Sequence, residues 1–396
     1  MLSTTCCIVG GGPAGMMLGL LLARAGVDVI VLEKHADFLR DFRGDTIHPS
    51  TMEVLHELGL LQDFLKLPHT PTARLGLQIG DQTLQVADFA HLPTQCKFIA
   101  MMPQWEFLNF IAEAASHHKS FRLMMSAEAV GLTDGGLIAK TRDGEVTINA
   151  GLIVAADGRH STVRDAAGFR VFEIGAPIDV LWLRLTHHAT DPVQSLGRIA
   201  GGRMMVTLDR GHYWQCAYVI PKGGIEATHA AGLPAFRSAI ARLMPHFADR
   251  VNELQSWDDI KLLTVAVNRL AEWSRPGLLF IGDAAHAMSP IGGVGVNLAI
   301  QDAVAAANIL VPKLCAGAVT PEDLRAVQQR REPPTIRTQR LQVFMQNRII
   351  SPALSNTGTF SPPLVLRVLQ WFPILRRIPA RVIGMGFQPE HIRHQA

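Results

Sequence analysis

The stretch "TTCCIVGGGPAGMMLGLLLARAGVDVIVLEKH", residues 4–35, decides the fold. It consists of a short apolar strand, a glycine loop, an apolar helix and a second apolar strand, at 6–9, 10–15, 16–25 and 27–32. Short apolar runs on either side of a helical segment are typical of parallel strands buried in a sheet. This order predicts a Rossmann-like βαβ unit that binds a dinucleotide, and it is a much stronger signal than the glycines alone.

Each glycine of the G-x-G-x-x-G loop has a separate physical role. Gly10 lets the chain turn off the strand, Gly12 lets the backbone approach a pyrophosphate, and Gly15 lets the helix pack on the sheet. Glu33 ends the second strand, where it can accept hydrogen bonds from ribose hydroxyls and where its charge disfavours a 2′-phosphate. FAD and NAD both remain open on this evidence. The cofactor-binding residues predicted in this unit are Gly10, Gly12, Pro13, Ala14, Gly15, Glu33 and Lys34.

Composition narrows the class of protein. The chain has 396 residues, enough for two domains, and its net charge of +3 gives no electrostatic case for binding nucleic acid. Five Cys without a C-x-x-C pattern, and an N-terminus unlike a signal peptide, indicate a cytoplasmic protein with free thiols. No apolar run reaches the roughly 20 residues of a membrane span. The 16 His show no metal-ligand spacing, so we expect no metal site.

Two more apolar strands, ending at Asp157-Gly158 and Gly282-Asp283, are expected in the same nucleotide-binding sheet. Between them, 178–220 alternates apolar and polar residues with a period near two, which predicts a second, inserted sheet. The predicted domains are a discontinuous nucleotide-binding domain, a β-sheet substrate domain and a C-terminal helical segment. The nucleotide-binding domain comprises 1–72, 102–177 and 270–315. The substrate domain comprises 73–101 and 178–269, and the helical segment comprises 316–396.

Several local features can also be predicted. Ser50 or Thr51 is expected to cap a helix, and 259–270 is expected to form one strand. The C-terminal helices are expected to break at Pro333-Pro334 and at Pro362-Pro363. The apolar, arginine-containing segment 363–386 could lie on a bilayer, but its prolines favour short helices that pack over the substrate domain.

Three motifs together resemble those of the single-component flavoprotein monooxygenases with the para-hydroxybenzoate hydroxylase fold. They are the N-terminal loop with Glu33, the stretch Ala156–Arg164 and the stretch Gly282–Asn297, and the resemblance covers about residues 5 to 315. It implies an α/β fold in which a Rossmann-like FAD-binding domain of the glutathione-reductase type is interleaved with a β-rich substrate domain and followed by C-terminal helices. It also implies FAD as the cofactor and NAD(P)H as a transient co-substrate without a domain of its own.

The resemblance implies further positions at the cofactor. The loop at 292–297 would hold the isoalloxazine ring, because its free N–H groups suit the N1–C2=O region of the reduced flavin. Val294 and Val296 depart from the polar residue and the Met that the family commonly has there. The implied cofactor-binding residues are Arg43, Gln104, Val130, Asp157, Gly158, Gly282, Asp283, Pro290, Gly293, Gly295, Val296 and Asn297.

The chemistry that the resemblance implies is hydroxylation of a small aromatic or polyketide-like substrate. NAD(P)H would reduce FAD, O2 would add at the flavin C4a, and the hydroperoxide would transfer one oxygen to the substrate. Arg184, Tyr213 and Gln215 lie on expected strands of the second sheet and are the candidates for polar contacts with the substrate. His286 is expected to have a structural role beside the flavin loop.

Three other functions fit parts of the pattern. A flavin-dependent halogenase would have W-x-W-x-I-P, whereas this chain has Cys216–Pro221, without either Trp. A reductase of the geranylgeranyl-reductase type would consume the nicotinamide cofactor without O2. A non-catalytic protein that binds a membrane surface would use the segment 363–386. The sequence leaves a homodimer open.

Overall fold

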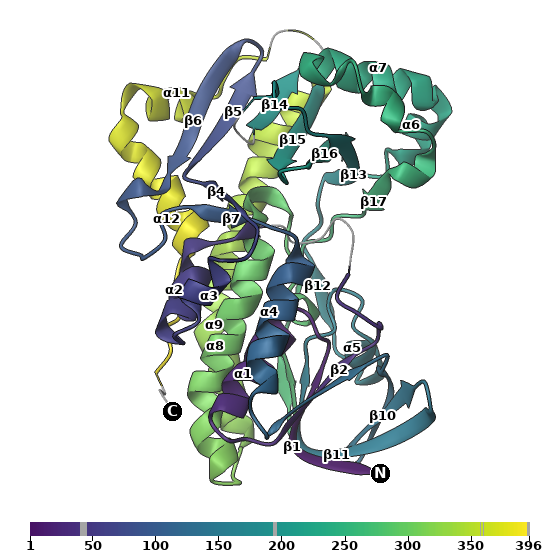
Figure 1. Ribbon diagram of the computed structural model, residues 1–396, viewed down its shortest axis with the longest axis vertical. Helices are drawn as coiled ribbons and strands as arrows, with labels where there is room; N and C mark the ends of the chain where they lie inside the picture. Colours follow the sequence, from purple (N-terminus) through teal and green to yellow (C-terminus); the bar gives the residue numbers. More distant parts are fainter. Residues whose placement is uncertain (40–45, 193–195, 357, 359, 394–396) are drawn as a thin grey trace.

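In the computed structural model, the described residues are 1–39, 46–192, 196–356, 358 and 360–393. They form a mixed α/β structure with two large sheets, one in the lower and one in the upper half of Figure 1. Long helices run between these regions, and the yellow C-terminal helices lie beside the upper sheet. The predicted α/β class is confirmed.

The lower sheet has eight strands, and its central strand is β1 (Leu2–Val9). β1 pairs in parallel with β2 (Val29–Glu33) on one side and with β11 (Gly144–Ala155) on the other. The remaining strands are β8 (Phe121–Met125), β9 (Glu128–Thr133), β10 (Gly136–Thr141), β19 (Ser274–Arg275) and β20 (Leu278–Phe280). Because the chain passes from β1 to β2 on one side and returns as β11 on the other, the carboxyl end of β1 is a topological switch point, the usual place for a ligand.

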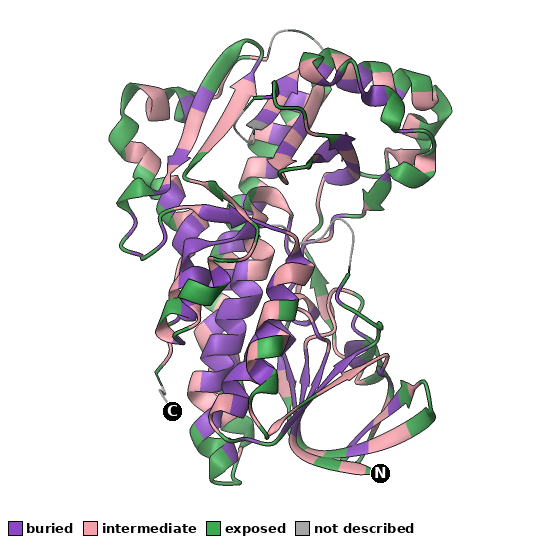
Figure 2. Cartoon of the chain, in the orientation of Figure 1, coloured by how far each residue is buried: buried purple, intermediate pink, exposed green. Residues whose placement is uncertain are grey.

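Helix α1 (Pro13–Arg24) covers one face of this sheet and packs against α8 (Val294–Cys315) and α4 (Gln104–Ser116). Both α1 and α8 are mostly buried, as the purple ribbons show (Figure 2). Among the described residues, one helix, Ile291–Cys315, is long and apolar enough to span a membrane. The protein itself buries 72% of that apolar stretch, as expected of a core helix.

The upper sheet has seven strands in the order β17-β13-β16-β15-β14-β5-β6. Its members are β17 (Lys261–Leu263), β13 (Ile178–Thr186), β16 (Tyr213–Pro221), β15 (Arg203–Asp209), β14 (Leu196–Ala200), β5 (Arg74–Ile79) and β6 (Gln82–Asp88). Alternate residues of β13 and β16, such as Leu183 and Cys216, point to a core made with α7 (Leu233–Leu243). The opposite face of these strands carries Trp182 and Ala217.

Two short sheets complete the fold, and one of them corrects a prediction. β12 (Val171–Glu173) pairs with β18 (Asn268–Leu270), and β3 (Thr46–Ile47), β7 (Ile99–Met101) and β4 (Thr70–Thr72) form the other. The single strand predicted over 259–270 is therefore wrong, because β17 and β18 belong to different sheets. The chain leaves the upper sheet after β17, where the Val265 N–H donates to the Asp179 carboxylate, 2.9 Å away.

The helix break predicted at Pro333-Pro334 is also wrong, since α9 (Pro321–Met345) runs through both prolines. A proline removes one backbone donor and crowds the preceding turn, but the long buried face of α9 outweighs this cost. The hydroxyls of Thr335 and Thr338 donate to carbonyls one turn earlier, at 2.8 and 2.9 Å, within the affected turns.

The cap predicted for the helix after residue 48 is wrong as well. α2 (Pro49–Glu57) begins after His48, and Ser50 and Thr51 lie inside its first turn. Their hydroxyls donate to Asn297 Oδ1 at 2.6 and 2.8 Å instead of capping the helix. Pro49 occupies the first helical position, where a missing N–H costs nothing.

Candidate functional site

The glycine loop after β1 has the geometry of a pyrophosphate site. A Cβ at Gly10 would lie 2.4 Å from the Ala156 carbonyl oxygen, and one at Gly15 would lie 2.0 Å from the Gly10 oxygen. Both positions therefore exclude any side chain. A Cβ at Gly12 would meet no atom within 4 Å, so Gly12 faces open space at the start of α1. Free N–H groups and open space at a helix N-terminus fit a phosphate.

Glu33 lies beside this loop at the carboxyl end of β2. Its Oε2 accepts from the Gly11 N–H at 3.1 Å, and its Oε1 accepts from the His35 N–H at 3.0 Å. These hydrogen bonds fix the carboxylate next to the loop, where a ribose would lie. Lys34 follows it and is exposed. Pro13 and Ala14 form the first turn of α1.

Val130 lies on β9, close to the same end of the sheet. The register between β9 and β10 shifts at this point, so Val130 has no partner residue in the ladder and is 43% exposed. The segment before it is held against the end of β2, because the Ala127 N–H donates to the Glu33 carbonyl at 2.9 Å. An exposed apolar side chain and an unpaired stretch of backbone suit the adenine end of a dinucleotide.

Asp157 and Gly158 follow β11, directly across from the glycine loop. Asp157 Oδ2 accepts from the Val163 N–H at 3.2 Å, so this carboxylate holds the start of the following helix. Burial raises the pKa of Asp157, although hydrogen bonds from Ser161 and Val163 oppose the rise. Gly158 has φ +87° with open space around it, a conformation that favours glycine.

Asp283 follows β20 and is one-third exposed. Its Oδ2 lies 3.5 Å from the Arg159 guanidinium, which joins the second and third sequence motifs. Gly282, just before it, has φ +60°, and a Cβ there would lie 3.1 Å from the Cβ of Ala14. The three sequence motifs thus converge at the carboxyl ends of β1, β11 and β20.

The second glycine loop lies at the start of α8. A Cβ at Gly293 would lie 2.5 Å from Thr46 Oγ1, whose hydroxyl donates to the Gly293 carbonyl at 3.0 Å. Asn297 is buried, and its Oδ1 is taken by the two α2 hydroxyls, so its side chain holds α2 to α8. Helix α8 begins at Val294, with Gly295 and Val296 in its first turn and Pro290 just before the loop. Gln104 is buried at the start of α4.

A buried network behind this loop was not predicted. His286 Nε2 lies 2.6 Å from Asp302 Oδ2, and Arg331 Nε lies 3.0 Å from Asp302 Oδ1. The Gly282 N–H donates to the same carboxylate at 3.0 Å, and Arg331 also pairs with Glu390. Burial raises the pKa of Asp302, but attraction to His286 and Arg331 outweighs burial and lowers it. The structural role expected for His286 agrees with these contacts.

Helix α9 and the π-helical turn that continues it (Gln346–Ile350) support the loop before the glycines with three glutamines. The Gln339 amide donates to the Ala287 carbonyl at 3.1 Å, and the Gln342 amide donates to the Ser289 carbonyl at 2.9 Å. The Gln346 amide donates to the Ser289 hydroxyl at 2.9 Å. These residues are far from the loop in sequence. Polar residues along one side of a helix do not indicate which distant segment they contact, so these contacts were not predicted from the sequence.

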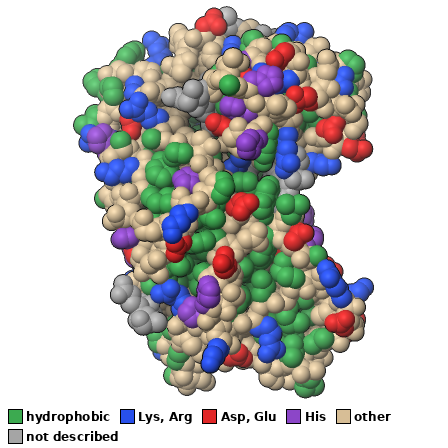
Figure 3. Space-filling view, in the orientation of Figure 1, with side chains coloured by type: hydrophobic (Ala, Val, Ile, Leu, Met, Phe, Trp, Pro, Cys, Tyr) green, Lys and Arg blue, Asp and Glu red, His purple; other side chains and the backbone are tan. Residues whose placement is uncertain are grey.

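The structure brings the three substrate candidates together on the sheet face opposite α7. Arg184 and Gln215 are cross-strand partners of β13 and β16, and the Arg184 guanidinium carbon lies 4.9 Å from the centroid of the Tyr213 ring. Among the described residues, Gln215 Nε2 is buried without a hydrogen-bond partner. The same face continues through Trp182 and Val180 as an apolar wall. The molecule is hollowed on the right between its two sheets, with hydrophobic side chains exposed there (Figure 3).

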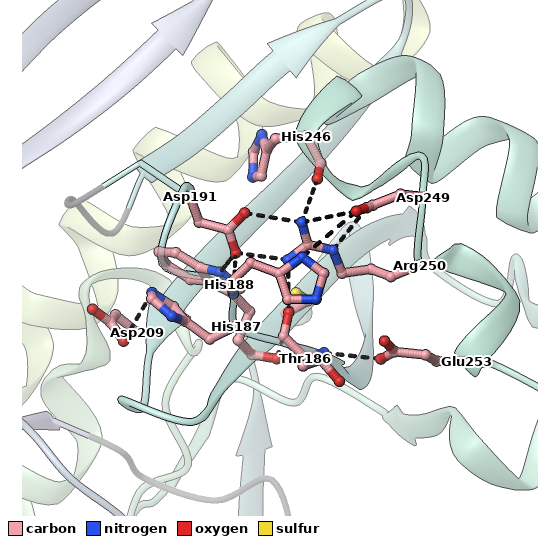
Figure 4. Close-up of polar contacts among 11 residues, drawn as sticks. Thr186, His187, His188, Asp191, Asp209, His246, Asp249, Arg250 and Glu253 are labelled. Carbon is pink, nitrogen blue, oxygen red and sulfur yellow. Dashed lines mark hydrogen bonds and ion pairs between the residues drawn. The ribbon is translucent and has the colours of Figure 1, made fainter.

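A dense ion-pair cluster fixes the chain after β13 on the α7 side of the upper sheet, opposite the face of the substrate candidates (Figure 4). Arg250 binds Asp191 through two nitrogens, at 2.7 and 3.0 Å, and both side chains are buried. Trp214 Nε1 and the His188 N–H also donate to Asp191. Burial raises the pKa of Asp191, but these hydrogen bonds and those from Arg250 outweigh burial and lower it. The cluster links β13, β16 and the segment around Arg250, and it is structural because its donors and acceptors bind one another.

Arg43 was predicted to bind the cofactor and lies outside the described residues. The other cofactor residues stay predictions. Within the described residues, no group of three or more His, Cys, Asp or Glu could hold a metal ion. The open space at Gly12, the fixed Glu33 and the convergence of the three motifs fit an FAD.

Comparisons with known proteins agree with this geometry. Residues 3–337 match the model of the FAD binding domain family. The chain is 34% identical to 6-methylpretetramide 4-monooxygenase of Streptomyces rimosus over 95% of this chain and 92% of that protein. It is 30% identical to an uncharacterized aromatic compound monooxygenase, YhjG, of Bacillus subtilis over 75% of this chain and 59% of that protein.

Among solved structures, the anhydrotetracycline hydroxylase OxyS of Streptomyces rimosus superposes with a TM-score of 0.75. The match covers 97% of this chain and 76% of that one at 20% identity, so it shows the fold. The match to the family model and the 34% identity along most of both chains show more than a shared fold. The chain belongs to the single-component FAD-dependent aromatic monooxygenases with the para-hydroxybenzoate hydroxylase fold.

Proposed function

We propose that this protein uses NAD(P)H and O2 to hydroxylate a small aromatic or polyketide-like substrate. The observation that carries the proposal is the similarity along almost the whole of both chains to a monooxygenase whose name specifies 6-methylpretetramide. A bound FAD would supply the redox and oxygen-transfer chemistry. The protein contributes binding, orientation and exclusion of water.

The proposed FAD site runs along the carboxyl ends of the parallel strands. Gly12 and the first turn of α1 would bind the pyrophosphate, and Glu33 would accept hydrogen bonds from the adenosine ribose hydroxyls. Asp283 would accept hydrogen bonds from ribityl hydroxyls, and the N–H groups of 294–296, in the first turn of α8, would hold the N1–C2=O edge of the ring. We propose that the remaining predicted cofactor residues line the same path.

The proposed substrate site is the upper-sheet face that carries Arg184, Tyr213 and Gln215. An apolar wall beside a small polar group suits a flat aromatic molecule with one or two oxygen substituents. The free Gln215 amide would donate to a substrate oxygen, which would satisfy a buried group that has no partner among the described residues. Arg184, held over the Tyr213 ring, would contact a phenolate or enolate oxygen.

We also propose the domain division that the sequence suggests. The eight-stranded sheet takes its strands from 2–33, 121–155 and 274–280, and the seven-stranded sheet takes its strands from 74–88 and 178–263. The cores on the two sheets are separate, which supports a discontinuous FAD-binding domain and an inserted substrate domain. Free cysteines, four of the five buried, are compatible with the cytoplasm that we propose as its location.

The test is a screen of aromatic and polycyclic compounds with the purified, FAD-loaded protein. We expect a yellow protein whose oxidation of NADH or NADPH accelerates with the right compound, together with a product that has gained one oxygen atom. Acceleration that persists without O2 would favour the reductase instead. A protein that takes up no FAD would refute the proposal altogether.

A further inference from the structure

The C-terminal helices leave an apolar face uncovered. α11 (Leu364–Trp371) and α12 (Arg377–Met385), joined by a short turn, lie along the outer side of β6 at the upper left of Figure 1. Thirteen large hydrophobic side chains of the described residues are exposed, and six of them fall within 364–378. Each of the six is more than half exposed: Leu364, Val365, Trp371, Phe372, Ile374 and Ile378. We call this set the 364–378 face.

The inner side of the same helices is firmly packed, so this exposure is not loose packing. Leu366 is buried against the sheet, and the Gln370 amide donates to the Gln85 carbonyl at 2.9 Å. A Cβ at Gly384 would lie 2.8 Å from Leu92 Cδ1, which shows how closely α12 approaches the body. The expected packing over the substrate domain therefore involves one side of these helices and leaves the other side free.

The charge of this region is strongly one-sided. From Pro333 to Pro389 the sequence contains seven Arg and no Asp, Glu or Lys, although the whole chain carries only +3. Arg367, Arg377 and Arg381 are exposed among the apolar residues, and the Arg367 guanidinium carbon lies 5.2 Å from the centroid of the Trp371 ring. Hydrophobic and basic side chains occur together on that edge of the molecule (Figure 3).

We propose that the 364–378 face docks the enzyme on an anionic lipid membrane surface. Short amphipathic helices with Trp, Phe and Ile on one face and Arg at its margin lie in the interfacial plane of a bilayer. Arginines there are attracted by acidic headgroups, whereas two copies of this positively charged face would repel each other. Prolines that interrupt a helix disfavour an isolated interfacial helix. They have little effect here, because the protein body holds α11 and α12 in place.

The test measures partition of the FAD-loaded, full-length protein onto vesicles by sedimentation. One set of vesicles is phosphatidylcholine alone, and the other contains a substantial fraction of phosphatidylglycerol. We expect binding to the anionic vesicles that weakens with salt, and little binding to the neutral ones. Binding that is absent, or equal on both vesicles, would overturn the proposal.

Two double variants separate the apolar and the charged contributions. Trp371→Ser with Ile374→Ser is expected to abolish sedimentation with vesicles. Arg367→Gln with Arg381→Gln is expected to weaken partition by roughly 30-fold. The matched control is Phe172→Ser, which removes an equally exposed aromatic side chain from β12 and should leave partition unchanged.

The same variants address the competing occupants of the face. If the folded Trp371→Ser, Ile374→Ser variant still binds vesicles, the face is not the membrane contact and the proposal fails. If, in addition, the wild-type protein is a dimer and this variant is a monomer, the face is a self-association surface. These readouts require no turnover, so their outcome is independent of the proposed hydroxylation.

Discussion

Asp302 on α8 lies 2.6 Å from His286 and 3.0 Å from Arg331 of α9, and all three side chains are buried. The carboxylate joins the turn after β20 to two helices and indirectly to the C-terminal segment through Glu390. Asp302→Asn would leave the Arg331 charge buried without its main partner. We expect the free energy of unfolding to fall by about 3–5 kcal/mol in urea denaturation.

The control for Asp302 is Glu322→Gln, which breaks an exposed pair with Arg325 and should cost under about 1 kcal/mol. An Asp302→Asn protein as stable as the wild type would show that the network does not stabilise the fold.

Gly12 and Gly15 lie three residues apart, but their substitution by alanine should have different effects. A Cβ at Gly12 meets no protein atom, so Gly12→Ala should fold normally and bind FAD more weakly, because the methyl group occupies the path of the pyrophosphate. A Cβ at Gly15 would overlap the Gly10 carbonyl, so Gly15→Ala should lose about 1–3 kcal/mol of stability or more without any cofactor. Thermal denaturation of the FAD-free protein and flavin fluorescence titration measure the two effects. Equal FAD affinity in Gly12→Ala would contradict the site.

Asp283→Ala is expected to weaken FAD binding by roughly 10- to 100-fold, because the carboxylate would lose its hydrogen bonds to ribityl hydroxyls. The measurement is the flavin content after gel filtration, together with titration of the FAD-free protein. Asp165→Ala removes a mostly exposed carboxylate near the same motifs and is the control. Unchanged flavin occupancy in Asp283→Ala would refute its assigned role.

Gln215→Leu separates substrate binding from stability. Because the amide nitrogen is buried without a partner among the described residues, its replacement by an apolar group should leave stability unchanged or higher. The KM for the aromatic substrate should rise roughly 5- to 100-fold if the amide donates to a substrate oxygen. Cys216→Ser changes the next residue on the α7 side and should affect stability without affecting KM. A Gln215→Leu enzyme with an unaltered KM would place the substrate elsewhere.

Because His48 is buried, we expect the free energy of unfolding to decrease in mild acid. Burial lowers the pKa of His48 to about 4, although a hydrogen bond to the Ile383 carbonyl at 2.7 Å opposes this shift. The unfolded chain takes up this proton near pH 6.5, so the contribution is complete above that pH and declines as the pH falls towards 4. Between pH 6.5 and 5 the decline should be about 1.5 kcal/mol, measured by urea denaturation. His48→Gln should show a shallower dependence, and the exposed His56→Gln should match the wild type.

The sequence predicts those parts of the fold whose signal is local. The N-terminal unit from β1 to Glu33 follows from one continuous stretch, because strand, glycine turn, helix and acid are neighbours in the chain. The strand alternation that places Arg184 and Gln215 on one sheet face is also local, and their pairing follows from the register.

The missed features depend on contacts between distant segments. Asp302 and Arg331 are ordinary charged residues on predicted helices, and only the packing of α8 on α9 makes them partners. The continuity of α9 through Pro333 likewise comes from tertiary burial, which overrides a strong local preference. Asn297 stays a predicted cofactor residue, but the sequence carries no sign that its oxygen accepts from two α2 hydroxyls in a segment almost 250 residues earlier.

The dependence of the second glycine loop on α9 limits how relatives of this protein can be recombined. The backbone at Ala287 and Ser289 is held by Gln339 and Gln342, and the turn at Gly282 is held through Asp302 by Arg331 and Glu390. A chimera with a crossover between α8 and α9 would pair a loop with glutamines selected for a different backbone. Working hybrids should therefore inherit 282–302 and 331–390 from the same parent.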